Sequence, residues 1–256
     1  MSPNLSRSRR RLSRAAAAAA FVLGGFQPAR AVVGGSEDSG PLARSAVMVL
    51  NSRGGVCSGI VVAPDAVLTA AHCVAGAGEF RVHWRGEDGQ PVLIAPAARA
   101  IHPAYVANSV AARRRSIDLA LLRTPSALPD RFRPVALSTS APARADGIAL
   151  GGYGVAREGD ARSTGTFRSV GLSAVQPYGP STILLWASGP RGAGACEGDS
   201  GGPMTDGSGT VVAVTSWAAG DRASGCGSMS QGILVSPQRD WLDRTLASWG
   251  RAAQWR

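Results

Sequence analysis

Lysine is absent from this sequence of 256 residues, so all 27 basic residues are arginines. Six of them precede residue 32, in a segment without any acidic residue: Arg7, Arg9, Arg10, Arg11, Arg14 and Arg30. From residue 32 onward, 21 arginines face 17 acidic residues, and the resulting charge of +4 is ordinary for a soluble domain. No predicted helix or strand carries clustered arginines with interleaved aromatic residues. Nucleic-acid binding is therefore not expected.

Histidine is scarce, and the C-x-x-C pattern is missing. With three histidines and four dispersed cysteines, no segment has the ligand spacing of a zinc site. Neither a tandem repeat nor a nucleotide-binding glycine motif occurs. We therefore expect no cofactor and no bound metal.

The N-terminal apolar run, residues 15–25, is too short to span a membrane. It follows a basic start and precedes Ala29-Arg30-Ala31, a small-x-small cleavage site, so residues 1–31 have the layout of a secretory signal peptide. The alternative is a membrane-anchored or disordered N-terminus. The Arg9-Arg10 pair resembles a twin-arginine signal, although Ser13 departs from that pattern, and the export route stays open. We expect a secreted or periplasmic protein without stable membrane insertion after cleavage.

The chain is rich in turn-forming residues, with 33 glycines and 16 prolines. Together with short apolar runs, this composition favours many strands over long helices. Strands are expected near residues 45–50, 57–62, 66–73, 80–84, 92–95, 116–122, 147–154, 168–175, 183–186, 211–217 and 232–235. The proline-rich stretch 125–142 is interpreted as a connection between two halves. Leu242, Leu246 and Trp249 have helical spacing and predict a C-terminal helix, with Ser236 as its cap and Pro237 at its first position.

The clearest candidate for chemistry is Ser200, in the stretch C-E-G-D-S-G-G-P at residues 196–203. Flanking glycines allow the backbone to turn tightly and leave its N–H groups accessible. A serine hydroxyl is a weak nucleophile unless a base takes its proton. Asp199 beside it would need a positive partner if it is buried.

Two residues could supply and orient that base. His72 ends an apolar run beside a cysteine, and Asp118 interrupts another apolar run. A lone histidine is more commonly structural, which is how we interpret His83 and His102, and an isolated aspartate can simply face solvent. If Asp118 lies next to His72, it can accept the ring N–H and hold the tautomer.

The four cysteines suggest two disulfides in an exported chain, with three possible connectivities. A Cys57–Cys73 bridge would tie down the strand end that carries His72. Closing such a loop of about 15 residues can stabilise a fold by roughly 3 kcal/mol.

Taken together, these stretches resemble the chymotrypsin-like (trypsin-fold) serine endopeptidases, in particular a secreted member of the bacterial type. The matching motifs follow the order of that family and cover nearly all of the chain after residue 31: V-V-G-G at 32–35, L-T-A-A-H-C at 68–73, I-H-P-A-Y at 101–105, I-D-L-A-L-L at 117–122, G-Y-G at 152–154, C-E-G-D-S-G-G-P at 196–203 and T-S-W at 215–217.

The resemblance implies an all-β fold of two six-stranded antiparallel Greek-key barrels with the active site between them, plus a C-terminal helix. The peptidase domain would span residues 32–250, with halves at about 32–130 and 143–235. The helix would cover 237–249 and a tail 251–256.

The same resemblance assigns catalytic roles. Ser200 would attack the peptide carbonyl, His72 would accept its proton and later protonate the leaving amine, and Asp118 would orient His72. The N–H groups of Gly198 and Ser200 would form the oxyanion hole, and Ser216 would support Asp118. The implied disulfides are Cys57–Cys73 and Cys196–Cys226.

The resemblance also locates a specificity pocket at Gly194, Ala218 and Gly232. Because Gly194 carries no charge and Ala218 adds a methyl group, a small or medium apolar residue is expected on the acyl side of the cut. Asp221 could line the rim, in a loop between Trp217 and Cys226 that looks about four residues longer than is usual in this family, and Glu197 could add a charge preference.

Asp199 resembles the aspartate that pairs with a buried N-terminal ammonium in this family, which would belong to Val32 here. Since Ala31 ends the signal-peptide pattern, export cleavage would itself create that ammonium, without a separate zymogen step. Glu79, Glu87 and Asp88 lie near a region where some relatives bind calcium, but they do not form a full ligand set and are taken as surface acids.

The expected protein is thus a monomeric enzyme that acts on proteins or peptides. One alternative is a catalytically silent relative that binds proteins, although no triad residue or oxyanion glycine is missing. Another is an esterase using the same serine, but the chain lacks the G-x-S-x-G elbow and the chain order Ser-Asp-His.

Overall fold

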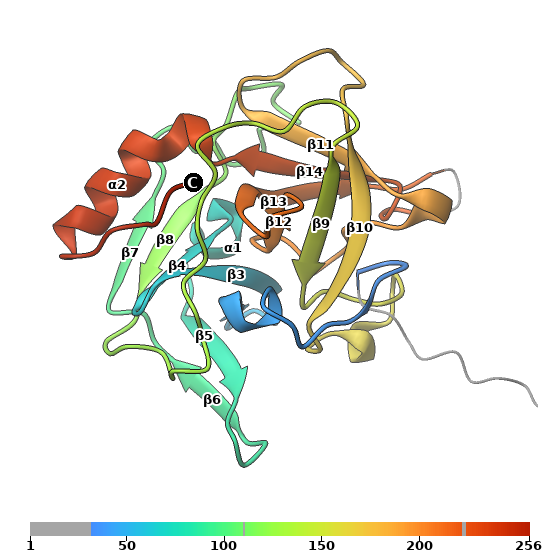
Figure 1. The fold of residues 1–256 in the computed structure, drawn as a ribbon. Helices are drawn as coiled ribbons and strands as arrows, with labels where there is room; N and C mark the ends of the chain where they lie inside the picture. Colours follow the sequence, from blue (N-terminus) through green and yellow to red (C-terminus); the bar gives the residue numbers. More distant parts are fainter. Residues whose placement is uncertain (1–31, 110, 222–223) are drawn as a thin grey trace, which may run out of the picture.

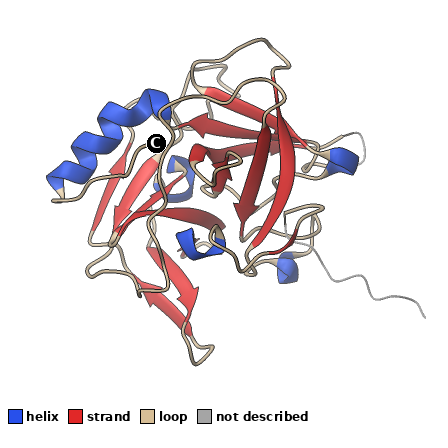
Figure 2. Ribbon diagram, in the orientation of Figure 1, coloured by secondary structure: helices blue, strands red, loops and turns tan. Residues whose placement is uncertain are grey.

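The short apolar runs of the sequence form antiparallel strands in a computed structural model that describes residues 32–109, 111–221 and 224–256. The predicted signal peptide, residues 1–31, lies outside the described residues. Within them, no helix has the length and apolar character needed to cross a bilayer. Figures 1 and 2 show two strand-rich halves side by side, with one long helix at the edge.

The first half is a curled sheet with the strand order β6-β5-β2-β3-β4-β8-β7, in which every neighbouring pair is antiparallel. Its strands are β2 (Ala46–Asn51), β3 (Val56–Ala63), β4 (Ala66–Thr69), β5 (Phe80–Arg85), β6 (Pro91–Ile94), β7 (Ala98–Ile101) and β8 (Ala120–Arg123). Among the described residues, no pairing joins β6 to β7, so this half is a half-barrel and not the closed barrel that was expected. Strand β2 pairs with residues 80–83 of β5, and the β5–β6 hairpin extends beyond this pairing (Figure 1).

The second half is a closed barrel of six strands. Their order is β10-β11-β14-β13-β12-β9, and an additional pairing of β9 with β10 closes the ring. The strands are β9 (Gly147–Gly152), β10 (Arg168–Val175), β11 (Leu184–Ser188), β12 (Pro203–Thr205), β13 (Val211–Ala219) and β14 (Met229–Leu234), and β1 (Ser36–Glu37) pairs with β10. The predicted all-β fold of two barrel-like halves is therefore confirmed, with one half open.

In the part of the chain that the structure describes, helical structure consists of short turns and one C-terminal helix. The turns are α1 (Ala71–Val74) and the 3-10 segments η1 (Ala43–Ser45), η2 (Ala161–Ser163), η3 (Pro190–Gly192) and η4 (Ser236–Gln238). The helix α2 (Arg239–Ser248) follows η4 and crosses back to the first half, where Trp241 packs edge-on against His102 with ring centroids 4.8 Å apart. Leu242 and Leu246 of α2 are fully buried.

The last residues of the chain are docked, which the sequence did not predict. No strand occurs between β8 and β9, but Leu137 in this connection bridges both Val211 and Trp255. Arg251 forms two contacts with the buried Asp65, Nε to Oδ1 at 2.6 Å and Nη2 to Oδ2 at 3.0 Å. Residues 251–256 therefore bind the connection and the first half.

Three apolar clusters hold the fold together. One fills each half, and the third lies between the halves and beneath α2, where its members include Leu68, Leu121, Val214, Ile233 and Leu246. Burial of this shared cluster fixes how the two halves meet. The candidate site lies at this boundary.

Candidate active site

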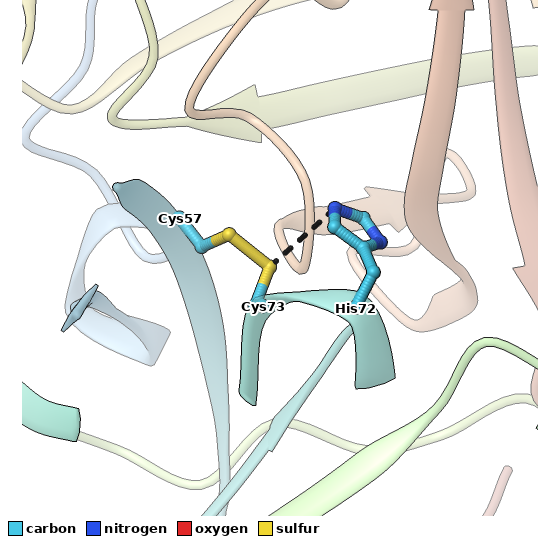
Figure 3. Close-up of side chains that lie close together, drawn as sticks. All are labelled: Cys57, His72 and Cys73. Carbon is cyan, nitrogen blue, oxygen red and sulfur yellow. Dashed lines mark hydrogen bonds between the residues drawn. A yellow bond between two sulfur atoms is a disulfide. The ribbon is translucent and has the colours of Figure 1, made fainter. Parts of the chain in front are cut away.

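His72 is carried by a single helical turn at the edge of the first half. Strand β4 ends at Thr69, and α1 follows directly. Cys73, the next residue, forms a disulfide with Cys57 near the start of β3, with a Cα–Cα distance of 6.2 Å. The imidazole lies beside this disulfide, its Nε2 3.7 Å from Cys73 Sγ (Figure 3). The bridge fixes the turn, while the His72 side chain remains 40% exposed.

Asp118, just before β8, contacts His72 twice. Its Oδ2 lies 2.6 Å from His72 Nδ1, and its Oδ1 accepts the backbone N–H of His72 at 2.8 Å. Ser216 Oγ on β13 donates to the same Oδ2 at 2.6 Å. Burial by itself would raise the pKa of Asp118, but the hydrogen bonds from His72 and Ser216 outweigh burial and hold that pKa below its ordinary value. An ionised Asp118 can keep the proton on Nδ1, which leaves Nε2 free to accept another.

Ser200 reaches the same disulfide from the second half. Its carbonyl oxygen lies 3.8 Å from Cys73 Sγ, the sulfur that also contacts His72 Nε2. The same carbonyl accepts the N–H of Ser58 at 2.8 Å, a bond that crosses between the halves. Ser200 and His72 therefore lie close together, because the Ser200 carbonyl oxygen and His72 Nε2 both contact Cys73 Sγ.

The backbone before Ser200 adopts a conformation that requires glycine. Gly198 has φ +94°, and a Cβ there would come within 2.7 Å of Gly154 Cα. The N–H groups of Gly198 and Ser200 donate no hydrogen bond to any described residue. Both N–H groups therefore remain available as donors to an oxygen that develops negative charge.

Ser58 is a residue of this site that the sequence analysis missed. Its side chain is fully buried, donates to the Gly198 carbonyl at 2.9 Å and accepts the Tyr153 N–H at 2.9 Å. The backbone N–H of Ser58 donates to the Ser200 carbonyl, so Ser58 forms hydrogen bonds with both ends of the 198–200 segment. One signal was available, since Ser58 is a polar residue inside an apolar run, as Asp118 is.

The predicted pocket residues do not all come together. Ser230, not Gly232, pairs with Ala218 across β13 and β14. Ser230 Oγ accepts the N–H of Ala195, and a Cβ on Gly194 would meet that oxygen at 2.7 Å and the Gly227 carbonyl at 2.3 Å.

Gly232 instead pairs with Thr215, inside the barrel. A Cβ there would contact Met204 Sδ at 2.6 Å and Ala213 Cβ at 2.9 Å. The interpretation of Gly232 as an open pocket position opposite Ala218 is therefore corrected, since the residue opposite Ala218 is Ser230. The second disulfide, Cys196–Cys226, lies beside this region.

Asp199 is completely buried. Its two carboxylate oxygens accept the N–H groups of Gly154 and Cys196, each at 2.9 Å. Burial raises its pKa to about 7, and these hydrogen bonds offset that rise only in part. Among the described residues it forms no ion pair.

Val32 is also fully buried, in the core of the second half, and its neighbour Val33 pairs with Gly194. In the uncleaved chain Val32 carries a peptide nitrogen and not an ammonium, so the predicted Val32–Asp199 ion pair cannot yet form. Val32 has φ +50°, a left-handed conformation that is strained for a β-branched residue.

The described residues contain one compact group of potential metal ligands, Cys57, His72 and Cys73. Both sulfurs belong to the disulfide, so neither is a thiolate that could bind a metal (Figure 3). Of the surface acids, Glu79 pairs with Arg81 at 2.8 Å, and Asp88 Oδ1 accepts the Gln90 N–H.

The other candidate residues lie outside the His72–Asp118–Ser200 cluster. His83 on β5 contacts the Val92 carbonyl through Nδ1 at 2.8 Å, and His102 packs on α2. Glu197 and Asp221 are exposed, and Asp221 lines a cavity beside the Cys196–Cys226 disulfide. Residues 222 and 223 of the same loop lie outside the described residues.

A cleft of about 250 Å³ opens beside His72. It is lined by Tyr105, Ser116 and Asp118 from the first half and by Trp217 and Gln231 from the second. Trp217 is 40% exposed and packs edge-on against Trp186, with ring centroids 6.3 Å apart. The cleft therefore presents both polar and aromatic side chains next to the imidazole.

Comparison with known proteins identifies the family of this arrangement. Kallikrein-15 from Saguinus oedipus is 29% identical over 205 residues, which cover 71% of this chain and 78% of that protein. Trypsin alpha from Drosophila erecta is 28% identical over 210 residues, covering 75% of this chain and 78% of the relative. These relatives are animal proteins, and a bacterial origin stays a prediction.

The solved structure described as neuropsin, a serine protease expressed in the limbic system of mouse brain, has the same fold. It superposes with a TM-score of 0.70 at 22% identity and covers 84% of this chain and 99% of its own. The family model described as Trypsin matches residues 32–242. The two disulfides fit an extracellular protein, and the family implies protein substrates. The chain belongs to the trypsin family of serine proteases.

Proposed function

We propose that this protein is an exported serine endopeptidase in which Ser200 forms an acyl-enzyme intermediate. The observation that carries the proposal is the Asp118–His72 contact at 2.6 Å, together with N–H groups of Gly198 and Ser200 that have no other partner among the described residues. His72 Nε2 would take the proton of Ser200 and return it to the leaving amine. Oxyanion donors of this type are worth roughly 3–4 kcal/mol each in the transition state.

The proposed preference is for a small uncharged residue on the acyl side of the cut. Ala218 and the buried Ser230 lie opposite one another, and Gly194 has no room for even a Cβ. Because no charged side chain occurs at these three positions, an arginine or lysine side chain of a substrate would be buried there without a partner. Burial of an unpaired charge is strongly unfavourable.

The proposed maturation step is signal cleavage after Ala31, with export of the twin-arginine type as one route. Cleavage would free the backbone of Val32 from its left-handed conformation, because φ no longer exists at a terminal residue. It would also supply an ammonium in the interior of the second half, where Asp199 forms no ion pair among the described residues and the attraction of Arg168 offsets burial only in part. Such a pair would lower the energetic penalty of ionising Asp199.

The test is a peptide-library digest with the processed protein beginning at Val32 and with a Ser200→Ala variant. We expect cleavage after small uncharged residues by the wild type and a loss of at least about 1000-fold in the variant, since the nucleophile is gone. No cleavage by the processed wild type would favour the catalytically silent relative. Equal cleavage by both proteins would place the activity elsewhere.

A further inference from the structure

A groove outside the candidate active site carries arginines on its rim and an apolar floor. It has a volume of about 280 Å³ and lies where β5, η1, the connection and the loop after β9 meet. Arg44, Arg85 and Arg131 line its rim, and Met48, Tyr153 and Phe167 lie in its floor. We name it the arginine groove.

The rim charges have no acidic partner. Arg44, Arg85 and Arg131 are exposed, and none lies within 4.0 Å of a carboxylate among the described residues. The acids within three residues of Arg85 and Arg131 are exposed and form no ion pair with them; these are Glu87, Asp88 and Asp130. The positive charge of the rim is therefore available to a ligand.

Arg131 is held in place over the groove. Its Nη2 donates to the Arg85 carbonyl, and its guanidinium lies 4.8 Å from the centre of the Phe132 ring. The Arg131 guanidinium therefore lies against the main chain of Arg85, whose own guanidinium donates to the Gly89 carbonyl. Arginine side chains gathered around one groove are of the kind that recognises acidic motifs in peptides.

The positive surface continues beyond the groove. Arg44 also lines a second cavity of about 420 Å³, together with Arg133. No acidic side chain lines either cavity. The positively charged surface is therefore large enough to contact more than one carboxylate of a bound ligand.

The floor favours a peptide over a nucleic acid. Trp84, Phe132 and Phe167 are at most 9% exposed, so their rings cannot stack on bases, as single-stranded nucleic acids require. Met48 and Tyr153 leave room for an apolar side chain above them. An acidic segment with one apolar residue matches both the rim and the floor.

The groove is separate from the cleft beside His72, with which it shares no lining residue. It is nevertheless joined to the oxyanion segment. Met48 pairs with Ser58 across β2 and β3, and the Tyr153 N–H donates to Ser58 Oγ. A segment bound in the groove would lie directly behind the residues that hold Ser200.

We propose that the arginine groove binds an acidic peptide segment of the protein substrate, with carboxylates on Arg44, Arg85 and Arg131 and an apolar side chain on the floor. The identification of the peptide as a segment of the substrate rests on the proposed function. Binding of the peptide requires no cleavage, so binding and cleavage can be tested separately.

The test measures binding of a labelled twelve-residue peptide, rich in Glu and Asp around one Phe, to the Ser200→Ala protein. Reversing two rim charges with R44E and R131E should weaken binding at least about tenfold, because close interfacial charge pairs contribute more than about 1.4 kcal/mol. The control R244E reverses an exposed charge on α2 and should change binding less than about twofold. Raising salt from about 0.05 to 0.5 M should weaken the wild-type complex as screening increases.

Three results would overturn the proposal. The first is that a peptide with Asn and Gln in place of Asp and Glu binds as tightly as the acidic peptide, and the second is that R244E weakens binding as much as the double reversal. The third is that a single-stranded oligonucleotide binds at the same residues as tightly as the acidic peptide. If the double reversal fails to fold, as judged by thermal unfolding, R44Q with R131Q tests the same charges. Cleavage of a short uncharged peptide by the wild type, measured separately, reports on the proposed function alone.

Discussion

Ser58 and Asp118 are both polar residues inside apolar runs, and both are buried where the two halves meet. Asp118 could be predicted from the sequence because a carboxylate in such a run needs a partner. The same signal is weaker for Ser58, since a serine hydroxyl can bond to its own or a neighbouring backbone group and therefore needs no distant partner. Its partners Gly198 and Tyr153 lie 140 and 95 residues away in the sequence, and no local sequence pattern indicates contacts over such separations.

Replacing Ser58 with alanine should lower kcat by about 10–100-fold and leave KM within about threefold. The change leaves the Gly198 carbonyl and the Tyr153 N–H without a buried partner, a penalty of about 1–3 kcal/mol that falls on the segment bearing the oxyanion donors. Steady-state kinetics measure both constants. The affinity for a peptide boronate, whose tetrahedral adduct uses the same donors, should fall in parallel with kcat.

Ser138→Ala is the matched control, because Ser138 is also buried and donates its hydroxyl proton to a carbonyl, that of Ser140, but lies in the connection. It should lose stability and keep kcat. If Ser58→Ala retained wild-type kcat and boronate affinity, Ser58 would be only structural.

The prediction for Gly232 shows a second limit on what the sequence reveals about single residues. Gly232 was assigned from the resemblance alone, and in the structure it pairs with Thr215. A bulge between Thr215 and Trp217 then places Ser230, and not Met229, opposite Ala218. A bulge has no reliable sequence signal, so the residue opposite Ala218 could be identified only from the structure.

Among the elements, those with a periodic apolar pattern were predicted best. The C-terminal helix was expected at 237–249 from the spacing of Leu242 and Leu246, and α2 spans Arg239–Ser248 after the 3-10 turn η4. The predicted cap was wrong, because Ser236 lies within η4 and no side-chain cap bond forms at either turn. Helix ends depend on hydrogen bonds that spacing does not specify.

The docked C-terminal segment has no periodic pattern, and its partners are distant in sequence. Arg251→Ala should lower the melting temperature by several degrees, because the buried Asp65 would keep only Arg123, whose Nε is 3.4 Å away. A loss of 1 kcal/mol corresponds to about 2–4 °C in a domain of this size. Differential scanning calorimetry of the processed protein measures this shift.

The control is Arg157→Ala, which removes a surface pair with Asp160 and should shift the melting temperature by less than about 1 °C.

The stabilisation by Arg251 should also depend on pH. Burial alone would raise the pKa of Asp65, but Arg251 and Arg123 hold that pKa below its ordinary value. Their contribution is present above the ordinary pKa and is lost as the pH falls through the lowered value. The difference between wild type and Arg251→Ala should therefore shrink in acid, and a constant difference would contradict this account.

For the whole molecule, the order of the motifs placed His72 and Asp118 in the first half and Ser200 and Ser216 in the second, and the structure has them so. What joins them is the apolar cluster between the halves, to which both halves and α2 contribute. The sequence could not show that the first half is open, since closure requires a pairing between β6 and β7, which no local sequence pattern specifies.

The state of the N-terminus should set how the stability of the whole protein depends on pH. In the uncleaved chain, burial raises the pKa of Asp199 from the ordinary 3.8 to about 7. Between these values the folded state binds more protons than the unfolded state, so stability falls as the pH rises through this interval, by up to about 4 kcal/mol for a shift of this size. In the processed protein, the Val32 ammonium should lower that pKa and remove the slope.

Urea unfolding of the refolded uncleaved chain and of the processed protein, from pH 5 to 8, measures both slopes, and N-terminal sequencing verifies each start. Asp199→Asn isolates the contribution of this group from that of His102, whose burial lowers its pKa and makes stability rise with pH. We expect the difference between wild type and Asp199→Asn to depend on pH in the uncleaved chain only. The same dependence in the processed protein would mean that Val32 does not pair with Asp199, and activation would then need another partner for this carboxylate.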